Sequence, residues 1–418
     1  MDIWHVRGGN RLFGSSRVQG SKNASLPVLA ASIVIPARSR IGNVPQLRDV
    51  DAAVSILSYL GCRVERKETE LYIDSSSVCC AEVPRELMAE MRSSVIFMGA
   101  LLARCGEARL SLPGGCQLGK RPIDLHLSSL RAMGAEIIEE GSDIYCRANK
   151  LHGADITLRF PSVGATENIM LAACAAEGRT TIRGAAREPE IEALQEYLTA
   201  LGAHIAGAGS DTVVICGAAP RAEAEYIVPG DRIVAATLAC ACAAAGGRVI
   251  LSGVNAEHFL TVLHFLKQAG CDIIQFNDIV EIASDGALRA PGSIVTAPYP
   301  GFPTDVQPIL MAALLRAEGT TQITETIFEN RYRQVSELRR LGADIQVRGA
   351  EALLRGVKEL HGETLTAPDL RGGAAMIVAG LTAGGETCVI DAGHITRGYD
   401  SFDDRLCALG AEVWIEHK

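Results

Sequence analysis

The sequence predicts an α/β protein made of two domains, each containing three copies of one β/α unit. The main observation is a pattern that returns six times, in which a helix-like segment ends in an apolar residue, glycine and then alanine or cysteine, and a β-rich run follows. The glycines of this pattern are 68 to 73 residues apart and are Gly61, Gly134, Gly202, Gly270, Gly342 and Gly410. With 418 residues and 48% hydrophobic side chains, the chain is large enough to bury two cores.

Each of these glycines is expected just after a helix, where a left-handed residue turns the chain into a strand. A second set of helices is rich in small side chains and precedes β-branched strands. Glycine follows five of them, and Pro36 follows the first. Because small side chains let helices approach closely, these helices should form the centre of each domain. They are expected at residues 24–35, 98–105, 170–177, 235–245, 309–318 and 374–383.

Six copies divide naturally as three plus three, with a hinge near Pro229 and Gly230. We expect one domain to span residues 22–229. The other should combine residues 1–21 with 230–418, because the short strand before Gly20 is predicted to cross into it. A single elongated array of six units is the alternative that the repeat pattern leaves open.

Composition and motifs exclude several classes of protein. A net charge of −9 does not indicate a nucleic-acid-binding surface. The cysteines and histidines lack metal-ligand spacing, and the usual nucleotide-binding and zinc-hydrolase motifs are missing. The most apolar stretch, residues 233–245, is too short to span a bilayer. We expect a cytoplasmic monomer with no metal, no cofactor and no membrane or nucleic-acid partner.

Basic residues stand at the starts of three small-residue helices, at Lys22, Arg92 and Arg371. A positive charge there opposes the helix dipole by about 0.3–1 kcal/mol. A bound anion would reverse the sign by pairing with both the side chain and the free N–H groups. Long basic side chains can also extend into solvent at little cost, so both interpretations stay open.

The segment around Cys116 is the sharpest local feature. Three glycines and two prolines between residues 113 and 122 predict an irregular, exposed loop. Lys120 and Arg121 follow the cysteine closely, and nearby cations favour the thiolate form of a cysteine. Such a thiol can donate or accept a proton in catalysis. The alternative is an incidental loop thiol.

Three further residues complete the candidate set. Asp305 follows a proline-rich approach, which fixes a carboxylate at a helix start either for chemistry or as a simple N-cap. Arg331 and Arg397 precede the second helices of the fifth and sixth repeats. Taken alone, either arginine would be interpreted as a surface residue.

Eight ordered segments resemble one known family over essentially the whole chain. The chain resembles the UDP-N-acetylglucosamine 1-carboxyvinyltransferases, which are enolpyruvyl transferases. The resemblance implies that each domain is an inside-out α/β barrel of three repeated units. It rests on residues 20–24, 112–116, 121–126, 161–168, 186–190, 303–305, 329–331 and 397–399.

The resemblance also implies a reaction. The 3′-hydroxyl of UDP-N-acetylglucosamine adds to C2 of phosphoenolpyruvate while C3 gains a proton, and phosphate then leaves as C3 loses a proton. This is the first committed step of peptidoglycan precursor synthesis. Two groups must move protons, and several cations must hold a phosphate and a carboxylate. Fosfomycin, a phosphonate epoxide, is expected to modify the cysteine.

Roles follow residue by residue from the resemblance. Cys116 would handle the proton at C3, and Asp305 would take the hydroxyl proton and contact substrate. Lys22, Arg121 and Arg397 would bind phosphoenolpyruvate. Lys22 and Arg397 are also expected to be catalytic residues. Residues expected to support the same anionic pocket are Arg92, Arg331 and Arg371. Residues that resemble the UDP-sugar contacts are Asn23, Asp124, Leu125, Ser162, Val163 and Gly164, with Ile327 close by.

The chain departs from the family pattern at Ser21, at Phe160 and in residues 229–234, where Gly230 is extra and Val234 replaces a glutamate. Two alternatives therefore stay open. One is a 5-enolpyruvylshikimate-3-phosphate synthase, against which the Pro-Gly-Gly-Cys segment argues. The other is a catalytically weak paralogue that binds UDP-sugar and regulates a partner.

Overall fold

The computed structural model describes residues 2–111 and 123–417. Contacts divide the chain into two compact units rather than one elongated array. Of the described residues, the N-terminal unit contains 20–111 and 123–229, and the C-terminal unit contains 2–19 and 230–417. By this division Gly20 and Ser21 belong with the N-terminal unit, whereas the sequence placed the boundary after Ser21. Ser21 is the N-cap of the first helix, since its hydroxyl accepts a hydrogen bond from the Ala24 N–H at 3.2 Å.

Each unit contains three four-stranded sheets of one topology. An edge strand pairs in parallel with the second strand, and the remaining two strands add antiparallel. The sheets of the N-terminal unit have the orders β14(Glu223–Ile227)-β3(Arg38–Gly42)-β5(Glu70–Asp74)-β4(Arg63–Lys67), β6(Glu82–Val83)-β7(Glu107–Ser111)-β9(Asp143–Arg147)-β8(Glu136–Glu140) and β10(Asp155–Thr157)-β11(Thr180–Arg183)-β13(Thr212–Ala218)-β12(Ala203–Ala206). Those of the C-terminal unit have the orders β2(Leu12–Arg17)-β15(Gly247–Ser252)-β17(Ile279–Ser284)-β16(Asp272–Phe276), β18(Ser293–Val295)-β19(Thr320–Thr324)-β21(Glu351–Arg355)-β20(Asp344–Arg348) and β22(Thr364–Thr366)-β23(Glu386–Asp391)-β1(Asp2–Arg7)-β24(Glu412–His417).

Both units close on themselves through strands that are distant in sequence. In the N-terminal unit the last strand, β14, pairs with β3 of the first repeat. In the C-terminal unit the strands of the N-terminal segment close the unit, since β2 pairs with β15 and β1 lies between β23 and β24. The predicted crossing of the N-terminal strand into the second unit is therefore present.

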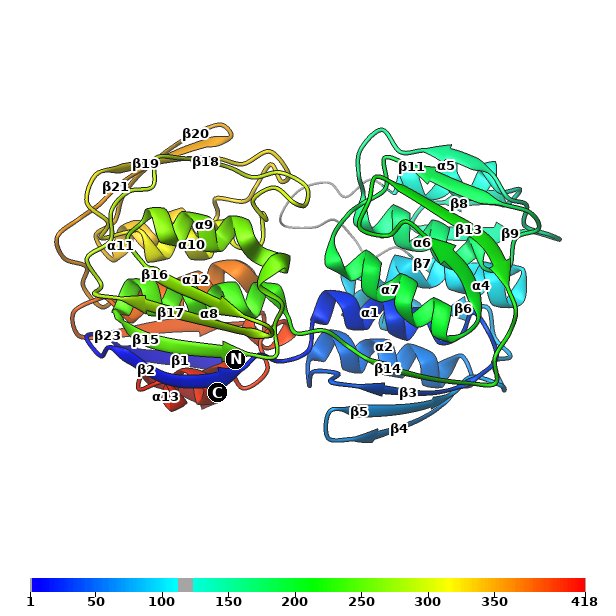
Figure 1. The fold of residues 1–418 in the computed structure, drawn as a ribbon, viewed down its shortest axis with the longest axis horizontal. Helices are drawn as coiled ribbons and strands as arrows, with labels where there is room; N and C mark the ends of the chain where they lie inside the picture. The colour runs from blue at the N-terminus through cyan, green and yellow to red at the C-terminus, as the bar shows by residue number, and fades with distance from the viewer. Residues whose placement is uncertain (1, 112–122, 418) are drawn as a thin grey trace. The chain divides into compact units, whose positions relative to one another are not determined.

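The small-residue helices lie inside each unit, and the sheets lie around them (Figure 1). Almost every side chain of these helices is buried, as expected for helices that are apolar on all sides. Each unit is thus an inside-out α/β barrel. The inner helices are α1 (Lys22–Ala31), α4 (Phe97–Cys105), α6 (Val163–Ala173), α8 (Arg232–Ala245), α10 (Gln307–Ala313) and α12 (Leu370–Gly380). The expected helix at 309–318 thus starts earlier and ends at Ala313, after which the chain continues in turns.

The second helix of each repeat ends two residues before the glycine that the repeat pattern predicted. All six of these glycines have φ between +95° and +105°, which confirms the expected left-handed turn from helix to strand. These helices are α2 (Arg48–Tyr59), α5 (Asp124–Ala132), α7 (Pro189–Ala200), α9 (Leu260–Gln268), α11 (Val335–Arg340) and α13 (Phe402–Ala408). The shorter connecting helices are α3 (Arg85–Glu90) and the 3₁₀ turns η1 (Arg92–Ile96), η2 (Ala256–Phe259) and η3 (Ile395–Arg397).

Close packing explains why a glycine stands at Gly230, the extra residue in the 229–234 segment. A Cβ atom at this position would lie 2.0 Å from the Gly253 carbonyl oxygen, which is backbone and cannot move aside cheaply. Gly230→Ala should therefore lower the free energy of unfolding by roughly 1–3 kcal/mol, the usual cost of overpacking. Urea unfolding would measure it, with Gly384→Ala as control, because the nearest atom there is 3.5 Å away. Equal stability of the two variants would contradict this explanation.

Candidate active site

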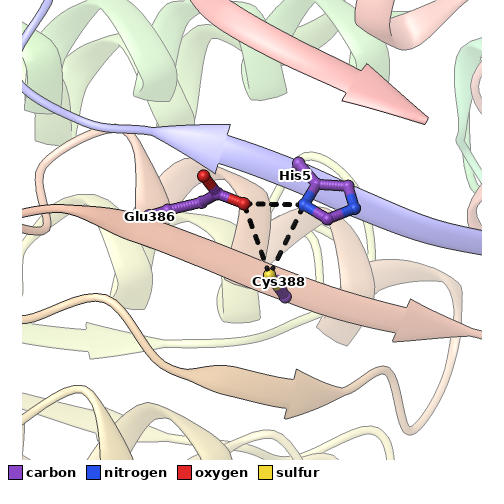
Figure 2. A group of neighbouring side chains, drawn as sticks. All are labelled: His5, Glu386 and Cys388. Carbon is purple, nitrogen blue, oxygen red and sulfur yellow. Dashed lines mark hydrogen bonds and ion pairs between the residues drawn. The ribbon is translucent and has the colours of Figure 1, made fainter. Parts of the chain in front are cut away.

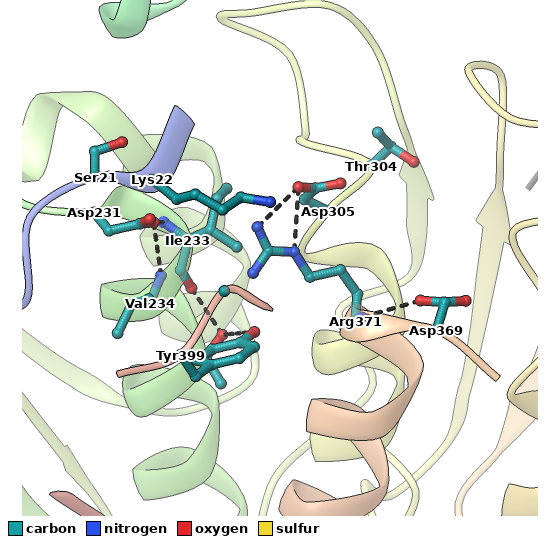
Figure 3. Close-up of polar contacts among 12 residues, drawn as sticks. Ser21, Lys22, Asp231, Ile233, Val234, Thr304, Asp305, Asp369, Arg371 and Tyr399 are labelled. Atoms are coloured by element: carbon teal, nitrogen blue, oxygen red, sulfur yellow. Dashed lines mark hydrogen bonds and ion pairs between the residues drawn. The ribbon is translucent and has the colours of Figure 1, made fainter. Parts of the chain in front are cut away.

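Three residues that the sequence singled out meet in the C-terminal unit. Arg331 Nη2 donates to Asp305 Oδ1 at 2.8 Å. Arg371 donates to the other oxygen, Oδ2, from Nη2 at 3.0 Å and from Nε at 3.2 Å. Figure 3 shows the Asp305 carboxylate and the Arg371 guanidinium facing each other. Each carboxylate oxygen is therefore held by a different guanidinium group.

Burial differs sharply within this group. The side chains of Arg331 and Arg371 are 2% and 3% exposed, whereas that of Asp305 is 30% exposed. Two positive charges surround one negative charge, so the three side chains together carry a positive charge. The carboxylate is the member that solvent or a substrate can reach.

The local sequence explains how each member is positioned. Asp305 stands in the turn before α10, and the N-cap position of that helix is Val306, so the simple N-cap interpretation of Asp305 is wrong. Arg331 also donates from Nε and Nη2 to the Thr304 carbonyl oxygen at 3.0 and 2.9 Å. This arginine therefore fixes both the carboxylate and the backbone of the turn that carries it.

Arg371 is the second residue of α12, and a carboxylate of the protein itself balances its charge at the helix start. Asp369 caps this helix by accepting hydrogen bonds from the N–H groups of Arg371 and Gly372, each at 3.0 Å (Figure 3). The Arg371 side chain turns to Asp305 and lies 5.4 Å from the centre of the Tyr399 ring. Burial alone would lower the pKa of Arg371, but the Asp305 carboxylate and Tyr399 outweigh it and raise the pKa above its ordinary value. Arg371 is thus permanently charged.

Arg397 lies in the 3₁₀ turn η3, two residues before Tyr399, whose ring contacts Arg371. Asp391 holds the start of the turn by accepting from the N–H groups of His394 and Ile395 at 2.8 and 3.0 Å. The Tyr399 hydroxyl is 3.0 Å from Thr237 Oγ1. Ile327 lies in the same unit and is linked to the Asp305 turn, since Glu325 accepts from the Ile327 N–H at 2.8 Å and from the Thr304 hydroxyl at 3.0 Å. It lines a pocket of about 430 Å³ with Tyr332.

In the N-terminal unit, Lys22 is balanced by a carboxylate that sequence reasoning missed. Lys22 Nζ lies 3.2 Å from Asp49 Oδ2, and Asp49 is buried on α2. Asn23 follows on α1. Asp49 stands in the first turn of its helix, where an acidic residue is common, and so gave no separate signal.

Apart from Asn23 on α1, the expected UDP-sugar contacts of the N-terminal unit lie at the starts of α5 and α6. Ser162 caps α6 by accepting from the Ala165 N–H at 3.3 Å, and Val163 and Gly164 follow it. Asp124 opens α5, is paired with Arg159 and precedes Leu125. The two helix starts are joined by a residue pair that the sequence analysis missed, since Asn168 Nδ2 lies 2.8 Å from His126 Nδ1.

His126 makes the stability of this region pH-dependent. Burial lowers its pKa to about 4, and Asp124 raises it only in part. Unfolded histidine titrates near pH 6.5, so between about pH 6.5 and pH 4 only the unfolded chain takes up this proton. The free energy of unfolding should therefore decrease as the pH is lowered across this window, by about 2 kcal/mol from pH 7 to pH 5.

Urea unfolding of wild type and His126→Gln at both pH values tests this. The variant should lose less stability on acidification than wild type, whatever its stability at pH 7. Equal losses in the two proteins would mean that other groups carry the pH dependence.

Cys116 and Arg121 lie outside the described residues, as does the side chain of Arg92, whose backbone opens η1. Among the described residues, no helix is both long and apolar enough to cross a membrane.

Comparison with known proteins identifies the family. A sequence profile described as EPSP synthase (3-phosphoshikimate 1-carboxyvinyltransferase) matches residues 6–406. UDP-N-acetylglucosamine 1-carboxyvinyltransferase 2 of Caldanaerobacter subterraneus is 46% identical over 413 residues, which is 99% of each chain. UDP-N-acetylglucosamine 1-carboxyvinyltransferase 1 of Symbiobacterium thermophilum is also 46% identical, over 98% of this chain and 94% of that one.

A solved structure agrees with these sequence matches. The enolpyruvyl transferase NikO from Streptomyces tendae superposes with a TM-score of 0.89, covering 99% of this chain and 98% of that chain at 26% identity. The chain therefore belongs to the EPSP synthase family of enolpyruvyl transferases, as the resemblance of its motifs to the UDP-N-acetylglucosamine 1-carboxyvinyltransferases predicted.

Proposed function

We propose that the chain transfers the enolpyruvyl group of phosphoenolpyruvate to the 3′-hydroxyl of UDP-N-acetylglucosamine and releases phosphate. The observation that carries this proposal is the 46% identity, over nearly the whole chain, to two enzymes named for that reaction. The product is a peptidoglycan precursor. The reaction takes place in the cytoplasm under this proposal, and the twelve described cysteines, all free thiols, are compatible with a reducing compartment.

Asp305 is proposed to accept the proton of the sugar hydroxyl as its oxygen bonds to C2 of phosphoenolpyruvate. Its partial exposure supports this role, because a base must reach the proton that it takes. Arg331 and Arg371 hold its two oxygens and so act as positioning residues. The resemblance implies that these two arginines support the pocket for the anionic substrate, whereas in the structure their charges face a carboxylate of the protein. Protonation of Asp305 would leave two buried guanidinium groups without their full counter-charge, so the proton should be passed on quickly.

The remaining roles are proposed from the family motifs. Cys116 would deliver a proton to C3, and phosphate would leave when C3 loses a proton. Lys22, Arg121 and Arg397 would bind the phosphate and carboxylate of phosphoenolpyruvate, with Arg92 in support. Asp49 keeps the Lys22 ammonium group in place at the start of α1 and offsets part of its charge.

The description of the family profile favours a second acceptor, shikimate 3-phosphate. Phosphate release from phosphoenolpyruvate, measured with each acceptor separately, distinguishes the possibilities. We expect release with UDP-N-acetylglucosamine and none above background with shikimate 3-phosphate. The reverse result would support a shikimate-type enzyme. Release with neither acceptor, in a protein that still binds UDP-sugar, would support the catalytically weak regulatory paralogue.

A further inference from the structure

Three potential metal ligands converge on the outer sheet of the last repeat, and none of them is among the proposed catalytic residues. His5 on β1 stands directly opposite Cys388 on β23, and Glu386 lies two residues before Cys388 on the same strand. Residues two apart on a strand share a face, so all three side chains project from one side of the sheet. Figure 2 shows them facing one another across the two strands. All three are partly buried.

The distances between the ligand atoms suit a tetrahedral zinc ion. Cys388 Sγ lies 3.5 Å from His5 Nδ1 and 3.8 Å from Glu386 Oε1, and His5 Nδ1 lies 2.8 Å from Glu386 Oε1. Zinc bond lengths of about 2.3 Å to sulfur and about 2.0–2.1 Å to nitrogen and oxygen give tetrahedral edges of about 3.5 Å for S–N and S–O and about 3.3 Å for N–O. Each observed edge is within about half an ångström of these values.

Surrounding groups orient the three ligands. Glu416 Oε2 lies 3.5 Å from His5 Nε2, the arrangement in which a carboxylate steers a metal-bound histidine through its second nitrogen. The Trp414 ring stacks on the imidazole with a centre-to-centre distance of 4.9 Å. Arg7 binds the other oxygen of Glu386 at 3.2 Å and also pairs with Glu412 at 2.6 Å, which leaves Oε1 directed at the cluster. Three glutamates against one arginine make the area favourable for a cation.

The same residue types could form a reactive cysteine–histidine–carboxylate triad. In a triad the carboxylate orients the histidine nitrogen that faces away from the thiol. Glu416 stands at that nitrogen here, 3.5 Å from Nε2, but Glu386 contacts the nitrogen that faces Cys388 at 2.8 Å. Because an ionised carboxylate accepts, Nδ1 donates to Glu386 and is not free to take the thiol proton. Three atoms that point at one another around a common centre indicate a coordination site.

We propose that His5, Glu386 and Cys388 bind one Zn²⁺ ion, with water as the fourth ligand. Thiolate, imidazole and carboxylate are the donors that zinc accepts, and three protein ligands with one open position is an established coordination pattern. Binding forms a zinc–sulfur bond, and the thiol proton passes to solvent. The ion joins β1, at the chain start, to β23 and so strengthens the strand pairing that closes the C-terminal unit. This proposal does not depend on the proposed enolpyruvyl transfer.

The test uses the full-length, reduced chain carrying Cys116→Ser, so that the other candidate thiol does not bind metal. Equilibrium dialysis against Zn²⁺, in competition with a chromogenic chelator, should give one ion per chain. Cys388→Ala and His5→Gln should each abolish this binding. Glu416→Gln should weaken it by about 10–100-fold, the usual effect of losing the group that orients a histidine ligand. Cys407→Ser, which removes an exposed thiol of the same unit, should bind like the parent protein.

Two further measurements distinguish loss of the zinc site from misfolding of a variant. Zn²⁺ should raise the melting temperature of the parent protein and leave that of Cys388→Ala unchanged. Co²⁺ should give a thiolate-to-metal absorption band in the parent and none in Cys388→Ala. Absence of zinc binding by the folded parent protein would overturn the proposal. The same zinc affinity in the parent, Cys388→Ala and His5→Gln would overturn it equally.

Discussion

Replacing Asp305 by asparagine is expected to lower turnover by roughly 10²- to 10⁴-fold, the usual contribution of a general base. Asparagine keeps the size of the side chain and one oxygen that can accept from a guanidinium group, but it cannot take the hydroxyl proton. Binding of UDP-N-acetylglucosamine should stay close to wild type, because the change removes a proton acceptor and no contact to an anionic group. Steady-state rates of phosphate release and calorimetric titration with the nucleotide sugar would measure both effects.

Asp305→Ala should add a loss of stability that the sequence alone did not predict. It leaves the buried guanidinium groups of Arg331 and Arg371 without their carboxylate partner, and breaking a buried ion pair in this way costs roughly 3–5 kcal/mol. Partial exposure of Asp305 places the expected value near the lower end. The cost should appear in urea unfolding as a lower midpoint for Asp305→Ala than for Asp305→Asn.

Asp369→Asn is the matched control, since it also exchanges a carboxylate for an amide beside Arg371. Asparagine caps a helix about as well as aspartate, so stability and turnover should both remain close to wild type. A folded Asp305→Asn enzyme with wild-type turnover would show that Asp305 serves structure alone.

Fosfomycin should form a single covalent adduct with the protein, on Cys116. Under the proposed role of Cys116, the anionic phosphonate would take the place of the phosphate and bring the epoxide to this thiol. The thiolate attacks an epoxide carbon, the C–O bond breaks and the oxygen takes up a proton. UDP-N-acetylglucosamine should accelerate the reaction. Intact mass and peptide mapping would locate the adduct.

The other cysteines should remain unmodified for two physical reasons. Burial raises the pKa of Cys62, Cys146, Cys174 and Cys242 to about 12 and that of Cys271 to about 11, so these side chains stay protonated. Exposed thiols such as Cys216 have no family motif for binding a phosphonate beside them. They serve as internal controls for non-specific alkylation.

Cys116→Asp separates the two roles of the thiol. A carboxyl group can also carry a proton, so this variant should keep measurable turnover, while its weaker nucleophilicity should make it resistant to the drug. Modification of another cysteine, or equal drug sensitivity of wild type and Cys116→Asp, would remove this thiol from the proposed site.

The parts of the fold that the sequence predicted are those that local chemistry determines. Gly61 and its five equivalents stand where the backbone adopts a conformation that favours glycine. The small-residue helices can be identified from the composition of a stretch of about ten residues. The Asp305 group could not be found in this way, because Arg331 and Arg371 are 26 and 66 residues away from Asp305 and meet its carboxylate only when the fifth and sixth repeats pack together. The sequence alone allows either a bound anion or an exposed side chain for Arg371, and its partner in the structure is a carboxylate of the chain itself.

The placement of β1 in the middle of the last sheet has a consequence for synthesis on the ribosome. Residues 2–17 are made long before the strands that pair with them, since β15, β23 and β24 begin only at residue 247 or later. The N-terminal unit, by contrast, has all its strands once residue 227 has emerged. β1 and β2 therefore stay unpaired while the whole N-terminal unit is synthesised and folds. Unpaired strands of nascent chains are open to aggregation, so the beginning of this protein is the segment that most needs protection by chaperones.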